Sequence, residues 1–129
     1  MSVERKKRLA KLVILQRRLK AFHETRHSGH VAAAHAAEEE AYELIRRFDD
    51  PASLSSLFPE VYHARIAGAF ARRDRCLAAA EEEARLVAAA TLRTNMVEDS
   101  YRDVSRAVDE KAADKERLEI VERKLTGGR

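Results

Sequence analysis

The sequence predicts an all-α protein, folded as a long antiparallel two-helix coiled-coil hairpin with a projecting C-terminal helix end. Both prolines, Pro51 and Pro59, lie in one short segment, and proline is excluded from helix interiors. The stretches on either side, 3–48 and 60–126, are dominated by Ala, Leu, Glu, Arg and Lys, which lose little on entering a helix. In both stretches apolar or small residues recur at steps of three and four, the period of a helix face.

The boundaries of the two helices follow from local signals. Ser2 is expected to cap the first helix, which should cover about 3–48. The residue before a proline avoids the α region, so Asp50 and Pro51 should end that helix and open a bend over 49–58. The second helix should then cover about 59–126 and stop at Gly127-Gly128. We therefore expect one domain, a single hairpin over residues 1–129.

A short bend makes neighbouring helices antiparallel, so residues whose numbers sum to about 107 should face each other. This rule pairs Leu19 with Val87, Phe22 with Ala84, and His30 with Leu77. The predicted stripe of the first helix passes through Leu12, Leu15, Leu19, Phe22, Arg26, His30, Ala33, Ala37, Ala41, Leu44 and Phe48. The stripe of the second passes through Tyr62, Ile66, Phe70, Arg73, Leu77, Ala80, Ala84, Val87, Thr91, Thr94, Val97, Tyr101, Val104, Val108 and Ala112.

The two predicted helices differ in length. In the antiparallel pairing the start of the first helix lies opposite residue 105 of the second helix. Residues 106–126 should therefore project beyond the first helix. This end still carries Leu118, Val121 and Leu125. An isolated helix of that length is marginal in water. A frayed or self-associating tail and a docking element for another protein are both consistent with the pattern.

Composition and charge exclude several classes of protein. No run of 18 apolar residues exists, so we expect a protein that is peripheral to a membrane at most. Leu9–Leu15 is interrupted by Lys11 and is not expected to be a secretory signal. The single cysteine, Cys76, fits a reducing cytoplasm. Net charge is +7 over 1–27, −5 over 28–60 and +1 over 61–129. Because the basic stretch lacks interleaved aromatic residues, nucleic acid is not expected as a partner.

The histidine-rich segment His23-Glu24-Thr25-Arg26-His27 matches the H-E-x-x-H zinc pattern, with His30 as a conceivable third ligand. A zinc hydrolase needs a walled cleft and a dry shell, which a two-helix hairpin does not supply. We therefore predict no metal site, no cofactor and no enzymatic activity. The glutamates of the repeated AAEEEA segments, 36–41 and 79–84, are expected to form a solvated helix surface.

Two regions carry more apolar residues than a two-helix seam requires. Near the bend lie Tyr42, Leu44, Ile45, Phe48, Leu54, Leu57, Phe58, Tyr62 and Phe70. These either close the hairpin by local packing or form a recognition tip. At the other end Leu9, Leu12, Leu15 and Leu19 form a band that a third surface is expected to cover.

The chain resembles the stalk family of the flagellar and type III secretion export apparatus, the FliJ/YscO-like proteins. The resemblance lies in the size, the basic start Arg5-Lys6-Lys7-Arg8-Leu9, the hairpin layout and the charged stretch from Val108 to Lys124. It implies a coiled-coil stalk that docks its termini in a hexameric export ATPase and contacts the export gate or escort chaperones.

Surface chemistry gives candidate residues for these contacts. Those for the ATPase are Arg5, Lys6, Arg8, Ile14, Leu118, Val121 and Leu125, and those for the gate or chaperones are Tyr42, Ile45, Phe58 and Tyr62. The alternative is a generic coiled-coil adaptor or homodimeric scaffold without an export role.

Overall fold

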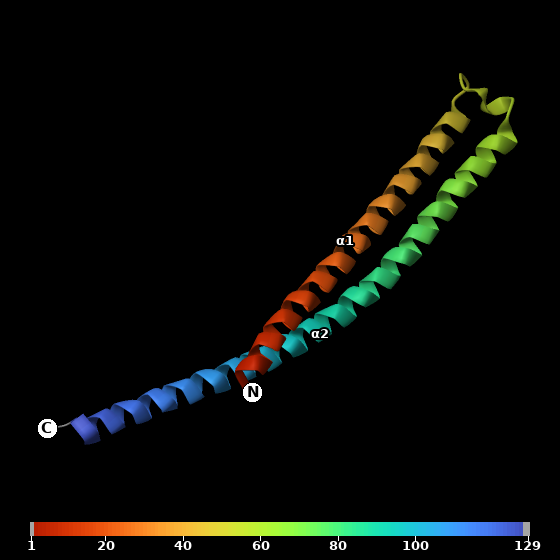
Figure 1. The fold of residues 1–129 in the computed structure, drawn as a ribbon. Coiled ribbons are helices and arrows are strands. Elements are labelled where there is room, and N and C mark those ends of the chain that lie inside the picture. Colours follow the sequence, from red (N-terminus) through yellow and green to blue (C-terminus); the bar gives the residue numbers. More distant parts are fainter. Residues whose placement is uncertain (1, 128–129) are drawn as a thin grey trace. The chain divides into compact units, whose positions relative to one another are not determined.

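A computed structural model describes residues 2–127 of the chain. The elements in order are helix α1 (Ser2–Asp49), the short 3-10 helix η1 (Leu54–Ser56) and helix α2 (Pro59–Gly127) (Figure 1). The described residues contain no strand. The all-α prediction and both helix spans are therefore confirmed to within a residue or two. Ser2 is already helical rather than a cap, and Gly128 lies outside the described residues.

Hydrogen bonds of its own polar groups hold the connection between the helices in place. Asp50 Oδ1 accepts a hydrogen bond from the Ala52 amide at 2.9 Å, as expected of an aspartate before a proline. The buried Ser55 hydroxyl donates to the carbonyl of Phe48 at 2.8 Å, which ties η1 back to the end of α1. The reversal is thus fixed by Asp50, Pro51 and Ser55.

The chain divides into two compact units. Lys20–Ala89, which contains the connection, is called here the turn unit, and Met1–Leu19 together with Ala90–Arg129 is called the terminal unit. Each unit contains a part of α1 and a part of α2.

In the turn unit the two helices pack antiparallel over a seam of small residues. Its buried apolar residues are Ala34, Ala37, Ala41 and Leu44 of α1 with Ala69 and Ala80 of α2. Alanine at these positions lets helix backbones approach closely. Nearer the connection aromatic rings pack between the helices, with Phe48 against Tyr62 at 6.1 Å in the seam and Tyr42 against Phe70 at 6.0 Å beside it, between ring centroids.

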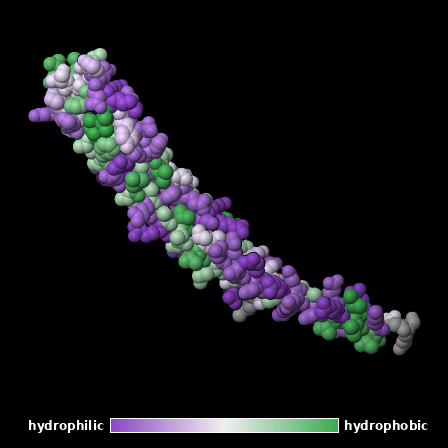
Figure 2. All heavy atoms as spheres, turned by 180° about the vertical axis from the view of Figure 1, so that it is seen from behind, coloured by the Kyte–Doolittle hydropathy of each residue, from purple (hydrophilic) through white to green (hydrophobic). Residues whose placement is uncertain are grey.

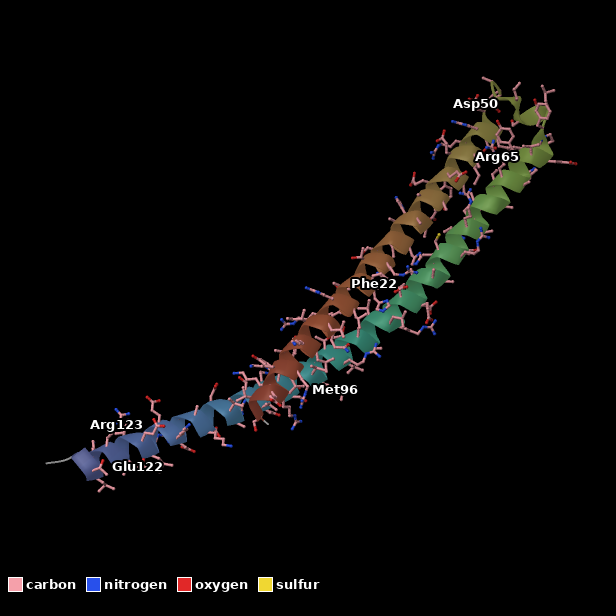
Figure 3. The ribbon with its side chains drawn as sticks, in the orientation of Figure 1. Phe22, Asp50, Arg65, Met96, Glu122 and Arg123 are labelled. Carbon is pink, nitrogen blue, oxygen red and sulfur yellow. The ribbon has the colours of Figure 1, made fainter. Side chains whose placement is uncertain are left out.

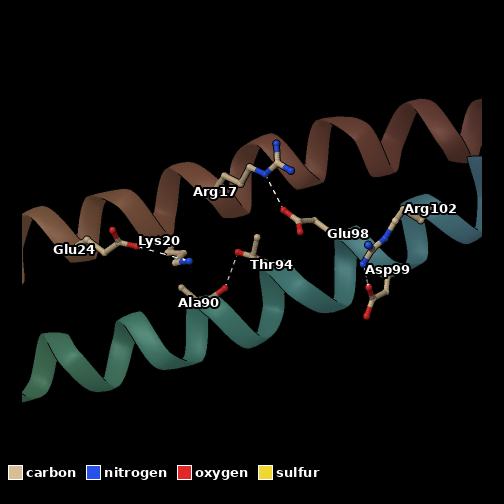
Figure 4. Close-up of polar contacts among 8 residues, drawn as sticks. All are labelled: Arg17, Lys20, Glu24, Ala90, Thr94, Glu98, Asp99 and Arg102. Atoms are coloured by element: carbon tan, nitrogen blue, oxygen red, sulfur yellow. Dashed lines mark hydrogen bonds and ion pairs between the residues drawn. The ribbon is translucent and has the colours of Figure 1, made fainter.

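In the terminal unit the start of α1 packs against the middle of α2. Val13, Ala90 and Thr94 are buried, and the Thr94 hydroxyl donates to the Ala90 carbonyl at 2.7 Å. Arg17 Nε donates to Glu98 Oε1 at 2.8 Å (Figure 4). Lys6 reaches Asp109 at 4.0 Å. Beyond Asp109 every described residue of α2 is exposed except the half-buried Ala113. The predicted projecting helix end is therefore present in this unit.

The seam has a strict seven-residue repeat. In α1 its two series are Lys6, Val13, Lys20, His27, Ala34, Ala41, Phe48 and Leu9, Gln16, His23, His30, Ala37, Leu44. In α2 they are Tyr62, Ala69, Cys76, Glu83, Ala90, Val97, Val104 and Ile66, Arg73, Ala80, Val87, Thr94, Tyr101, Val108. All of these residues are buried or half-buried. Such spacing is the a/d pattern of a coiled coil.

This repeat corrects the predicted stripe at the start of α1. Leu15 and Leu19 were expected in the seam but are 52% and 39% exposed, and the seam takes Gln16 and Lys20 instead. The seam likewise takes His23 rather than the predicted Phe22, and Ala80 rather than the predicted Leu77. Leu77 and Phe22 are exposed. The buried alanines between Ala34 and Ala41 determine which side of α1 faces α2. Because the seam repeats every seven residues, that side passes through residues that are not apolar at the start of α1.

Candidate protein-binding surfaces

A carboxylate lies in the seam of the turn unit. Glu83 of α2 has a side chain that is only 8% exposed. Its Oε1 accepts a hydrogen bond from Arg26 Nε at 2.8 Å, and its Oε2 lies 2.8 Å from His23 Nδ1. An ionised carboxylate only accepts, so His23 carries its hydrogen on Nδ1. The prediction that the AAEEEA glutamates are solvated is therefore wrong for Glu83, because Arg26 and His23 satisfy both of its oxygens.

These two partners also fix the charge state of Glu83. Hydrogen bonds from Arg26 and then His23 hold the pKa of Glu83 below its ordinary value of 4.5, against the opposing effect of burial. A lowered carboxyl pKa stabilises the folded chain at pH values above 4.5. The stabilisation is lost as the pH falls through the lowered pKa.

Replacement of Glu83 by glutamine tests this linkage. We expect E83Q to be less stable than the parent at neutral pH, because Arg26 loses its charged partner. The difference should shrink on acidification from neutral pH through the lowered pKa of Glu83, because the parent carboxylate then becomes protonated too. Urea unfolding followed by circular dichroism across this range measures it. A parallel offset at every pH would contradict the assignment. The control is E81Q, at an exposed glutamate of the same AAEEEA segment, which should change stability little.

The H-E-x-x-H histidines lie in or beside the seam. His23 is held by Glu83, His27 lies beside Ala84 and Val87, and His30 lines a shallow groove with Cys76. Within residues 2–127 no group of three or more His, Cys, Asp or Glu side chains is arranged to hold a metal ion. The sequence pattern is explained by helix packing, because i and i+4 put both His23 and His27 on the seam side of α1.

The end of the turn unit near the connection exposes apolar side chains. Of the four residues expected to contact a gate or chaperone, Phe58 is 55% and Tyr42 45% exposed, whereas Ile45 and Tyr62 are half-buried. Sequence reasoning named Leu54 and Leu57 only as part of a cluster and missed Val61. All three are more than half exposed. Local packing and an exposed tip thus coexist. Phe48 and Tyr62 pack together, while Leu54, Leu57, Phe58 and Val61 remain at the surface.

The terminal unit holds the residues expected to contact an ATPase, in two separate groups. Arg5, Arg8 and Ile14 are exposed on α1, whereas Lys6 is half-buried. Leu118, Val121 and Leu125 are 63%, 51% and 80% exposed on α2. Lys6 lies opposite Asp109, and Leu118 lies nine residues further along α2, about 13 Å at the helical rise. The two groups are therefore neighbouring surfaces rather than one site.

The helix end beyond Asp109 carries exposed apolar side chains among charged ones. Figure 2 shows hydrophobic side chains gathered near the C-terminal end of α2. The exposed apolar residues of this stretch are Leu118, Ile120, Val121 and Leu125. Glu122 and Arg123 extend from the same turns (Figure 3), and Arg117 pairs with Asp114 at 3.0 Å. Exposed pairs of this kind stabilise a helix by only tenths of a kcal/mol.

These observations define a class: a two-helix coiled coil whose exposed apolar surfaces lie at its connection and along the free end of α2. Comparison of the chain with protein-family models, with curated proteins and with solved structures finds no match. Among residues 2–127, neither helix contains a segment apolar and long enough to cross a bilayer.

Proposed function

We propose that the chain is a non-enzymatic coiled-coil stalk of a flagellar or type III protein export apparatus. Its terminal unit docks in the ring of the export ATPase, and the exposed tip of its turn unit contacts an export gate or an escort chaperone. The observation that carries the proposal is the end of α2 beyond Asp109, which is exposed on all sides and keeps an apolar stripe.

The apolar stripe at the end of α2 follows from the spacing of its residues in the sequence. Leu118, Val121 and Leu125 recur at steps of three and four and lie on one side of the helix. Each contributes about 1.5–3 kcal/mol when fully buried. A surface on another protein that covers this stripe would therefore both bind the helix end and stabilise it, since the end has no partner helix in its own unit.

The basic start of α1 adds a second component. Arg5 and Arg8 are exposed, and charge of one sign at a docking end speeds encounter with an oppositely charged partner. The apolar tip formed by Leu54, Leu57, Phe58 and Val61 lies in the other unit and supplies a separate contact surface. Two surfaces of this kind suit a protein that connects partners.

Reconstitution with an export ATPase tests the proposal. Deletion of residues 108–129, or the triple variant L118S/V121S/L125S, should abolish stimulation of ATP hydrolysis while the remaining chain stays helical by circular dichroism. The matched control is E116S/R123S, which alters the opposite side of the same turns and should keep stimulation close to that of the parent chain. Unchanged stimulation by the deletion variant would overturn the proposal. So would a stable four-helix dimer in sedimentation that buries the stripe, because that result favours a homodimeric scaffold.

A further inference from the structure

The start of α1 carries a second apolar stripe beside the seam. Leu12, Leu15 and Leu19 recur at steps of three and four, as a seam does, yet they are 37%, 52% and 39% exposed. The seam positions next to them are Val13, Gln16 and Lys20. A helix with two adjacent stripes of this kind has one side for its hairpin partner and another for a further helix.

The ion pair of the terminal unit shows on which side this stripe lies. Arg17 bonds Glu98 across one flank of the seam (Figure 4). By the helical period Leu12, Leu15 and Leu19 lie on the opposite flank. Met96 of α2 is 68% exposed and by the same period belongs to that opposite flank. The leucine stripe of α1 therefore lies on the flank of the seam opposite the Arg17–Glu98 ion pair, and Met96 adds an exposed apolar side chain to the same flank of α2.

The charges around the stripe restrict its occupant. Residues 2–19 contain seven Arg or Lys and one acid, Glu4. Arg8, Lys11 and Arg18 are exposed and adjoin the leucines on the side away from the seam. A second copy of this segment would bring the same positive charges together, which is unfavourable. A bilayer favours a broad apolar face, whereas this stripe is narrow and bounded by α2 on one side.

We infer that this flank of the terminal unit is a docking site for an acidic amphipathic helix of a protein partner, laid beside α1 as a third helix. Leucines of the partner enter between Leu12, Leu15 and Leu19, and its flanking carboxylates meet Arg8, Lys11 and Arg18. The site is distinct from the stripe on the free end of α2 and does not depend on the proposed export role.

A labelled synthetic helix provides the test. The probe is a fluorescein-labelled heptad peptide with leucine at its first and fourth positions and glutamate at the flanking positions, and its counterpart carries lysine in place of glutamate. Fluorescence anisotropy with the full chain should show the acidic peptide binding roughly tenfold or more tightly than the basic one, with affinity falling as salt is added. The variant L15D should weaken binding of the acidic peptide by roughly tenfold or more.

The matched control is I14D, which adds the same charge at an apolar residue of α1 that is 51% exposed and lies on the other flank, beside Arg17 and Glu98. It should leave binding unchanged. Equal binding of both peptides, or binding insensitive to L15D, would overturn the inference. So would a dimer of the chain in sedimentation that L15D dissociates, since a second copy then covers the stripe. Binding to phosphatidylglycerol vesicles that is lost in L15D, without binding of the acidic peptide, would assign the stripe to a membrane surface instead.

Discussion

Substitution of Leu44 by alanine is expected to lower the free energy of unfolding by about 2–5 kcal/mol, near the lower limit because the seam is thin. Leu44 is the largest aliphatic side chain buried in the turn unit, at 6% exposure. Its removal leaves a gap in a seam whose other buried apolar residues in this unit are alanines, which are too small to fill it.

The control for Leu44 is L57A. Leu57 lies in the same unit but is 69% exposed, so its truncation should change stability by no more than about 0.5 kcal/mol. Urea unfolding of the two variants and the parent gives the comparison. Equal losses in both variants would mean that the seam does not run through Leu44.

Enlargement of the seam should be harmful as well. Ala41 and Ala69 are fully buried, and a leucine at either position has no space unless the helices separate. We expect A41L to destabilise the chain by about 1–3 kcal/mol through overpacking. A71L is the control, because Ala71 is exposed and leucine suits a helix surface about as well as alanine does.

The measurement for this pair is thermal unfolding followed by circular dichroism. The two outcomes separate a close-packed alanine seam from a loose one. A41L with the stability of the parent would show that the helices are not in close contact at this position.

The sequence was sufficient to predict the elements because their limits are local. Pro51 and Pro59 are excluded from helix interiors and Gly127 favours a helix end, and the long stretches between them contain good helix formers. The helices accordingly begin and end within a residue or two of the predicted limits. The phase of the seam is not local. It is set where packing is closest, around Ala34–Leu44, and is carried along the helix by the seven-residue repeat.

Because the side of α1 that faces α2 is set by distant packing, the prediction that Leu15 and Leu19 lie in the seam was wrong. A search for apolar residues selects Leu12, Leu15 and Leu19, whereas the seam contains Gln16, Lys20 and His23. Glu83 was missed because a glutamate among glutamates has no distinctive signal in the sequence. The signal that was available is its seven-residue spacing from Cys76 and Ala90, which becomes visible only when the phase is known. The surface residues Ile14, Leu118, Val121 and Leu125 were easier to select, since apolar residues off the seam or beyond its end are exposed.

Hydrogen–deuterium exchange of the intact chain, alone and with the export ATPase, tests the central claim most directly. The account predicts strong amide protection around Ala34–Leu44 in both samples. It predicts fast exchange over residues 110–127 in the free chain, because an unpartnered helix end opens readily, and protection of the same residues once the ATPase is added. Protection of 110–127 in the free chain, or fast exchange there in both samples, would contradict it.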